Sequence, residues 1–200
     1  MRKQVIVLIA LCTALNLGLG NVVFMLKLPI YLDMVGTILC AMILWNERHV
    51  GFAAASIAGI LSFLLGGIVN PYLPWFSGTA IAVSAFTAYV TSRHAEYFRN
   101  SSFGTPGFWV RLIGFGLITG VVSAVVSAPV VVYLFGGVTA SGSVVLVAFF
   151  LKVGKQLMEA ALLSGLSTDT IDKTIELVLA VLLFRATPMS FLKRFQSGKQ

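Results

Sequence analysis

Charged residues are scarce in this chain, and their scarcity excludes an ordinary soluble domain. Only 10% of the 200 residues are charged, whereas 58% are hydrophobic, and the mean hydropathy is +0.96. A soluble domain carries about 25% charged residues. The sequence therefore predicts an integral membrane protein. No strand-like alternation of polar and apolar residues is present, so we expect an all-α bundle rather than a β-barrel.

Cysteines and catalytic motifs are equally sparse. The two cysteines, Cys12 and Cys40, lie inside apolar segments and show neither metal-ligand spacing nor a disulfide pattern. The sequence contains no HExxH, P-loop or CxxC motif. The seven acidic residues are expected to form no close pair within the membrane. We therefore expect neither an enzyme nor an ATP-driven motor, with no catalytic residues, no metal and no cofactor.

The chain is basic, with a formal net charge of +7 and a pI of about 9.7. Its Lys and Arg residues are scattered near the ends of apolar segments and are not clustered with aromatic residues. This distribution is typical of cytoplasmic anchoring in a membrane protein. It argues against nucleic-acid binding, which needs a concentrated basic surface.

Six apolar segments are predicted to form a six-helix transmembrane bundle, because each crossing needs roughly 20 residues. The first is interpreted as an uncleaved helix rather than a signal peptide. Pro29 prevents an unbroken helix into the second, and Ser167–Asp169 is expected to cap the last. The predicted helices span residues 5–26, 30–45, 50–69, 79–94, 109–135 and 170–186.

An additional amphipathic outer helical segment is expected at about 144–164. Lys152, Lys155, Gln156 and Glu159 are spaced i, i+3, i+4 and i+7, so one helix would carry all four on one face. We call these four residues the outer stripe. The composition of this segment is compatible with three arrangements: it crosses the membrane, dips into it or lies on its surface.

The positive-inside rule favours six crossings with both termini cytoplasmic. That topology divides the 14 basic residues ten to four, whereas a seventh crossing nearly removes the bias. The inside group is Arg2, Lys3, Arg48, Arg93, Arg99, Arg111, Arg185, Lys193, Arg194 and Lys199, and the outside group is Lys27, Lys152, Lys155 and Lys173.

Polar and aromatic groups of the outer loops form the predicted substrate site. Such groups suit a small polar ligand, although the outer stripe also fits a wetted surface with an internal Lys155–Glu159 pair. The two aromatic residues among them are equally typical of a membrane interface. The candidate substrate-binding residues are Lys155, Gln156, Glu159, Thr139, Asn21, Asn70, Tyr72 and Trp75. Asp33 is interpreted as a partner of a helix dipole instead.

Small residues form smooth rows on two predicted helices. Ala10, Ala14 and Gly18 recur every four residues in the first, so that another helix can approach closely, either within the bundle or from a partner. The fifth helix carries a similar row of four residues, which are Gly116, Gly120, Ala124 and Ala128.

The chain resembles the S component of energy-coupling factor (ECF) transporters, the membrane subunit that captures vitamins and related micronutrients. The resemblance lies in Ala10–Ala14, similar to the AxxxA motif that docks on the shared T component, in the run LPIYLDMVGTIL at Leu28–Leu39, and in residues 172–188. It implies a multi-pass protein of the prokaryotic plasma membrane with both ends cytoplasmic. It also implies an extracellular substrate site closed by the loop after helix one, and a complex with a T component and two ATPase subunits.

Two other classes of function stay open at this point. A stand-alone secondary transporter would favour seven crossings, with Glu159 inside the membrane as a coupling residue. A non-transport membrane scaffold would need no binding site at all. A small molecule that co-purifies with the protein separates capture from both alternatives.

Overall fold

A computed structural model describes residues 2–139 and 141–196, and its regular structure is entirely helical. The all-α prediction is therefore confirmed. The elements are α1 (Lys3–Met25), α2 (Val35–Ile43), α3 (Arg48–Gly66), the 3₁₀ helix η1 (Leu73–Phe76), α4 (Ser77–Asn100), α5 (Pro106–Phe135), α6 (Val144–Lys152), α7 (Leu157–Ala186) and α8 (Met189–Gln196).

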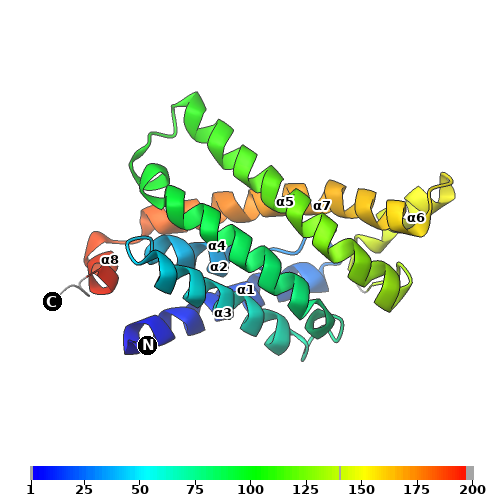
Figure 1. The fold of residues 1–200 in the computed structure, drawn as a ribbon, viewed down its shortest axis with the longest axis horizontal. Coiled ribbons are helices and arrows are strands. Elements are labelled where there is room, and N and C mark those ends of the chain that lie inside the picture. Colours follow the sequence, from blue (N-terminus) through cyan, green and yellow to red (C-terminus); the bar gives the residue numbers. More distant parts are fainter. Residues whose placement is uncertain (1, 140, 197–200) are drawn as a thin grey trace.

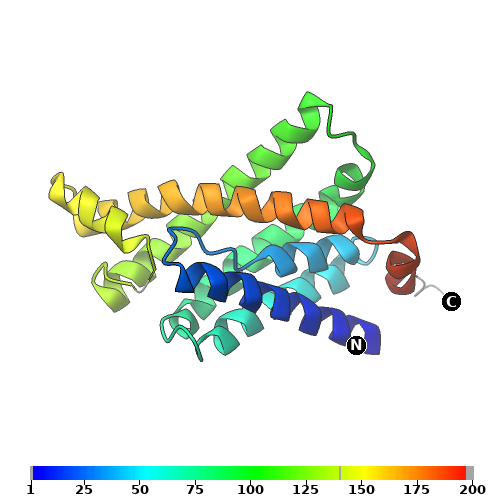
Figure 2. The same ribbon diagram turned by 180° about the vertical axis from the view of Figure 1, so that it is seen from behind.

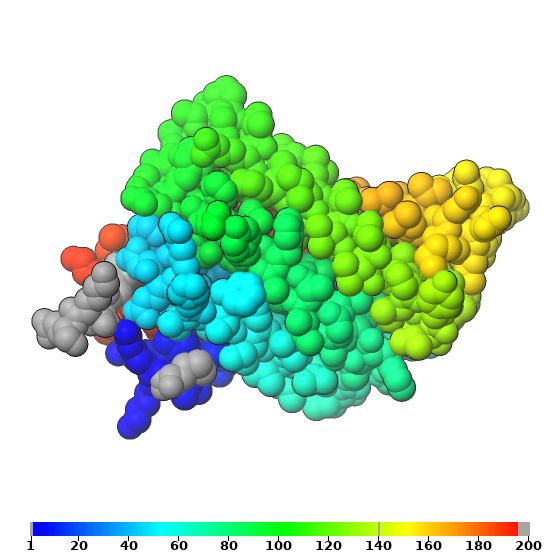
Figure 3. All heavy atoms as spheres, in the orientation of Figure 1, coloured from blue at the N-terminus to red at the C-terminus, as the bar shows by residue number. Residues whose placement is uncertain are grey.

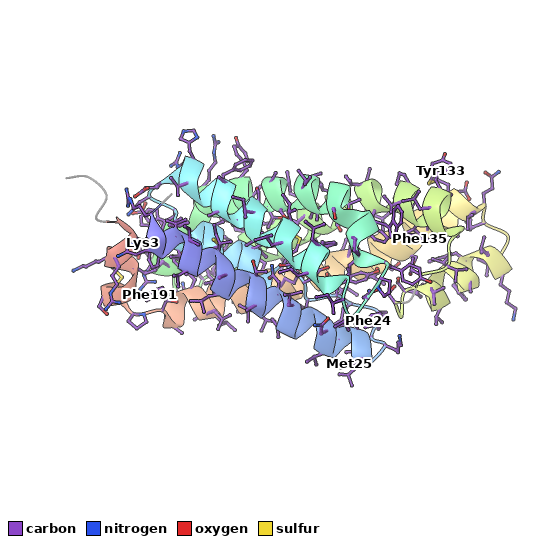
Figure 4. All side chains as sticks on the ribbon, turned by 90° about the horizontal axis from the view of Figure 1, so that it is seen from below. Lys3, Phe24, Met25, Tyr133, Phe135 and Phe191 are labelled. Atoms are coloured by element: carbon purple, nitrogen blue, oxygen red, sulfur yellow. The ribbon has the colours of Figure 1, made fainter. Side chains whose placement is uncertain are left out.

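α7 runs along the long axis and α5 crosses it obliquely, while the start of α1 and α8 lie at the same end of the molecule (Figure 1). The α2–α3 turn, the α4–α5 linker and α8 lie toward this end, which we call the terminal end. The α1–α2 loop, η1 and α6 lie toward the opposite end, which we call the loop end. Figure 4 places Lys3 and Phe191 at the terminal end and Tyr133 and Phe135 at the loop end.

Among the described residues, four helices are long and apolar enough to cross a membrane: α1, α3, η1 with α4, and α5. A fifth candidate span joins α7 to α8, which are bent by 100° at the break between them. This pattern is compatible with a multi-pass membrane protein. α2 has only nine residues, too few to span by itself, so helix lengths alone do not give six crossings.

Most of the basic residues belong to one or the other end of the molecule, whereas Lys173 of the predicted outside group lies in the middle of α7. Lys199 lies outside the described residues. Arg2, Lys3, Arg48, Arg99, Arg185, Lys193 and Arg194 belong to elements of the terminal end, whereas Lys27, Lys152 and Lys155 belong to those of the loop end.

α5 and α7 pack closely because the row of small residues on α5 faces α7. A Cβ atom added to Gly120 would lie 2.6 Å from the Thr170 backbone nitrogen, nearer than real carbon atoms approach. A Cβ atom added to Gly165 of α7 would likewise lie only 3.0 Å from the Cβ atom of Ala124. On the face that Figure 3 shows, the other helices cover the middle of α7, which is visible mainly at its two ends. The prediction of a close-packing row on α5 is confirmed.

At the terminal end, two arginines fasten α4 to α7 by capping each other's helices. Arg99 Nη1 donates to the Phe184 carbonyl over 2.9 Å, and Arg185 Nε donates to the Phe98 carbonyl over 2.6 Å. The last carbonyls of a helix have no partner within it. Arg185 supplies a donor to the Phe98 carbonyl, and Arg99 adds one to the Phe184 carbonyl, which also accepts from the Thr187 nitrogen. The terminal end of the bundle is therefore held by reciprocal caps.

The structure corrects two sequence predictions near the outer stripe. The single helix expected over 144–164 is broken, since α6 ends at Lys152 and α7 begins at Leu157. Gly154 has a φ of 87°, a left-handed conformation that glycine adopts without steric cost. The cap expected at Ser167–Asp169 is also wrong, because α7 runs unbroken through these residues.

Candidate functional site

A cavity of about 140 Å³ lies in the half of the bundle toward the loop end. Its walls come from the C-terminal halves of α1, α3 and α5, the start of α4 and the middle of α7, and loop residues complete them. The polar lining residues are Asn16, Asn21, Tyr31, Asp33, Ser62, Asn70, Tyr72, Thr79, Ser123, Ser127, Thr139, Ser141, Asp169 and Lys173.

Lys173 of α7 contacts three carboxylates beside this cavity. Lys173 Nζ lies 3.0 Å from Asp33 Oδ1, 2.8 Å from Asp172 Oδ2 and 3.0 Å from Glu176 Oε2. The contacts to Asp33 and Asp172 are hydrogen bonds, whereas the contact to Glu176 is an ion pair without hydrogen-bond geometry. The side chains of Asp172 and Glu176 are fully buried. We call these four residues the lysine cluster.

The lysine cluster also holds the α1–α2 loop in place through its backbone. Asp172 Oδ1 accepts hydrogen bonds from the backbone nitrogens of both Tyr31 and Leu32, each over 2.9 Å. Glu176 Oε1 accepts from the Met34 nitrogen over 2.8 Å. Leu32 has a φ of 50°, which is costly for a side chain other than glycine. The carboxylates of α7 thus fix a loop conformation that the loop sequence alone disfavours, and Figure 2 shows the loop passing beside α7.

A second loop packs on the first, and both contribute lining residues to the cavity, which is partly open. Gly142 packs directly on the backbone of Lys27 and Leu28, where an added Cβ would lie 2.8 Å from the Leu28 carbonyl carbon. The Tyr31 hydroxyl lies 2.9 Å from Ser143 Oγ, and Ser164 of α7 donates to the Ser143 carbonyl over 3.1 Å. The two loops therefore form one hydrogen-bonded unit that is tied to α7.

Asn16 organises the inner wall where α1, α2 and α3 meet. Its side-chain nitrogen donates to Thr37 Oγ1 and Ser62 Oγ, each over 3.0 Å, and its oxygen accepts from the Gly36 nitrogen over 2.6 Å. A Cβ at position 36 would collide with the Cys12 carbonyl, so glycine allows α2 to approach α1. The amide fixes the short α2 helix against the wall of the cavity.

Aromatic rings line the side of the cavity formed by η1 and the end of α5. Tyr72 and Phe76 both border the cavity and pack on Phe135, with ring centroids 5.0 Å and 5.7 Å apart. The Phe76 and Phe135 rings are stacked, with 17° between their planes. The cavity thus combines a flat apolar side with amides, hydroxyls and carboxylates.

The structure brings half of the predicted substrate residues together. Asn21, Asn70, Tyr72 and Thr139 all line the cavity. The other four are exposed and are not among its lining residues: Lys155, Gln156, Glu159 and Trp75. Lys155 and Glu159 lie 3.9 Å apart in an exposed pair. A role of these four in binding stays a prediction from the sequence.

The lysine cluster was not predicted as a site, and the expectation that the acidic residues form no close pair is wrong. Oxygens of Asp33, Asp172 and Glu176 lie within 4.8 Å of one another. One signal was available in the sequence: four charged residues, Asp169, Asp172, Lys173 and Glu176, repeat the spacing of the outer stripe within or beside the predicted last span. Ionisable residues inside a span are costly and usually functional.

The three carboxylates of the lysine cluster are close enough to share a metal ion. The Lys173 ammonium, however, lies within 3.0 Å of all three. A side-chain cation therefore takes the position that a metal ion would need. The geometry favours an internal salt-bridge cluster over a metal centre.

The predicted docking row lies on the outside of α1. Ala10, Ala14 and Gly18 are all exposed, and an added Cβ at Gly18 would meet no atom within 4 Å. Their neighbours Val7 and Leu11 are also exposed, at 57% and 58%. The row is therefore not an internal packing face of this chain.

We predict that Lys173→Met strongly destabilises the protein. Methionine keeps the length of the side chain but leaves three carboxylates without their cation, and removing one partner of a buried ion pair costs about 3–5 kcal/mol. Thermal unfolding in detergent measures the loss. Adding Glu176→Gln should recover part of it, because one unpaired charge is removed.

Lys155→Met is the matched control, since it removes a lysine from an exposed pair with its glutamate one turn away. Exposed pairs contribute at most about 1 kcal/mol, so this variant should unfold close to wild type. Equal unfolding temperatures for Lys173→Met and Lys155→Met would show that the lysine cluster does not stabilise the fold.

Comparison with protein-family models, with curated proteins and with solved structures finds no match for this chain.

Proposed function

We propose that this protein is the substrate-capturing component of an ECF-type transporter, which binds a small micronutrient and passes it inward with partner subunits. The observation that carries the proposal is the partly open cavity of about 140 Å³ at the loop end, with two hydrogen-bonded loops in its wall. A cavity with apolar walls and a few convergent polar groups is the default form of a small-molecule site. No ATP-binding motif occurs in the sequence, so the energy for release would come from partner subunits.

The two loops in the cavity wall support capture rather than simple structural packing. Residues of the α1–α2 loop line the cavity and are held by α7 and by Gly142 and its neighbours. The resemblance in the sequence implies closure of the substrate site by this same loop. A loop held by hydrogen bonds to its backbone can open locally while the helices beneath it stay folded.

We further propose six crossings with both termini cytoplasmic and the cavity facing the extracellular side of a prokaryotic plasma membrane. In this topology α2 completes its crossing together with the non-helical residues 30–34. Support comes from the gathering of basic residues in elements of the terminal end, since cytoplasmic ends carry an excess of Lys and Arg.

Single cysteines test this orientation in a variant that lacks Cys12 and Cys40. A cysteine at Lys155 should react with an impermeant thiol reagent in intact cells, because that position is exposed at the loop end. A cysteine at Lys193 should react only after the cells are permeabilised. Labelling of position 193 in intact cells would contradict the proposed topology.

The exposed row on α1 is proposed as the contact with a T component, which joins two ATPase subunits in the complete transporter. We predict that Ala14→Trp abolishes uptake while binding by the isolated protein is retained. A bulky ring prevents two helix backbones from approaching closely, but position 14 does not line the cavity.

Ala82→Trp provides the matched control, since Ala82 is also an exposed alanine, on α4. It should leave both uptake and binding near wild type. If Ala14→Trp lowers binding and uptake together, the row supports the fold of this chain and does not dock a partner.

Identification of the bound molecule tests the proposed function directly. Protein purified alone in mild detergent should retain a small organic compound that mass spectrometry detects in the denatured extract. Asn16→Leu removes the amide that organises the inner wall and should abolish its retention. Absence of any co-purifying compound, together with uptake driven by an ion gradient without ATPase subunits, would favour a stand-alone secondary transporter.

A further inference from the structure

The carboxylate of Asp169 differs from every other acidic group near the cavity, because no cationic side chain of the described residues lies within salt-bridge distance of it. Its side chain lines the cavity, and the residue is only 5% exposed. The Thr168 hydroxyl donates to its Oδ1 over 3.1 Å, and Ser123 of α5 also hydrogen-bonds to it. Within the described residues, no Lys, Arg or His forms a salt bridge with it.

The lysine of the cavity is already committed elsewhere. Lys173 is the only cationic residue of the described lining, and its ammonium contacts three other carboxylates within 3.0 Å. Two carboxyl groups, Asp33 and Asp169, therefore line the cavity together with one ammonium. The electrostatic environment attracts a cation and repels an anion.

A buried carboxylate without a cation is costly, and it can accept more hydrogen bonds than two hydroxyls supply. A ligand that brings a positive charge or a strong N–H donor would satisfy the remaining acceptor positions. Such charge-assisted hydrogen bonds are roughly twice as strong as neutral ones. Asp169 thus has the position and the unused capacity of a ligand-recognition residue.

The remaining walls define the shape of the ligand. The cavity volume of about 140 Å³ is close to that of an engineered cavity of roughly 150 Å³ that accepts benzene. Tyr72 and Phe76 present aromatic rings to it, and Asn21 and Asn70 present amides. A single planar ring fits this combination of size and surface.

We propose that the ligand is a small organic cation with one planar ring, whose positively charged nitrogen group binds Asp169. The ring packs beside Tyr72 and Phe76, and the amides bind its other polar substituents. This inference rests on the proposed capture function and adds the charge and size of the captured molecule.

Three probes of nearly identical shape separate charge from size: benzamidinium (cationic), benzamide (neutral) and benzoate (anionic). Calorimetry on the purified wild-type protein, freed of bound compounds, should show the order benzamidinium, benzamide, benzoate from tightest to weakest. Asp169→Asn preserves the shape of the side chain but removes its charge. It should lower the affinity for benzamidinium about 10- to 150-fold, the loss expected for one charged hydrogen bond. The affinity for benzamide should be nearly unchanged.

Asp33→Asn is the matched control, because Asp33 also lines the cavity but is paired with Lys173. It should weaken benzamidinium much less than Asp169→Asn does, and the unfolding temperature of each variant reports whether it is folded. Equal affinity of wild type and Asp169→Asn for benzamidinium, or tightest binding of benzoate, would overturn the inference.

The proposed function and this inference fail in different ways. An anionic or neutral co-purifying compound would overturn the cationic ligand and still support capture. Binding of none of the three probes would likewise overturn a ring-sized cation, whereas capture itself is decided by the co-purification experiment.

Discussion

The Lys173 ammonium is the contact on which the cavity half of the molecule depends. It lies among three carboxylates, two of them fully buried, and without it their mutual repulsion would push the centre of the bundle apart. Because Asp172 and Glu176 are held in this way, their outer oxygens are free to accept the backbone N–H groups of residues 31, 32 and 34. One ion cluster therefore positions both α7 and the loop over the cavity.

That arrangement explains why polar groups occur so deep in a protein with so few charges. A buried ion pair is weak evidence for stability, since desolvation offsets much of its attraction. Here the carboxylates do two things that apolar side chains cannot do: they satisfy loop backbone groups that are removed from water, and they hold Leu32 in a left-handed conformation. The cluster is best understood as the anchor of the loop, and Asp169, one turn earlier on α7, is left to face the cavity.

The division between the two ends of the bundle follows the same logic. At the terminal end, arginines cap helix carbonyls and basic residues gather, an arrangement that fixes the helices relative to one another. At the loop end, closure relies on hydrogen bonds between loops and on the cluster. An arginine-capped base with hydrogen-bonded loops at the other end is compatible with the proposed capture and release of a small molecule.

Composition and local pattern determined the helical class, the apolar segments, the asymmetry of basic residues and the close-packing row on α5, because each depends on residues near one another in the sequence. Two stripes share the spacing i, i+3, i+4, i+7, one at Lys152–Glu159 and one at Asp169–Glu176, and local pattern cannot tell which is buried. Only the tertiary structure decides this. Gly154 interrupts the first stripe at an exposed tip, whereas Gly120 of α5 and a loop about 140 residues away enclose the second. Because burial depends on such distant partners, the site could be identified only from the tertiary structure.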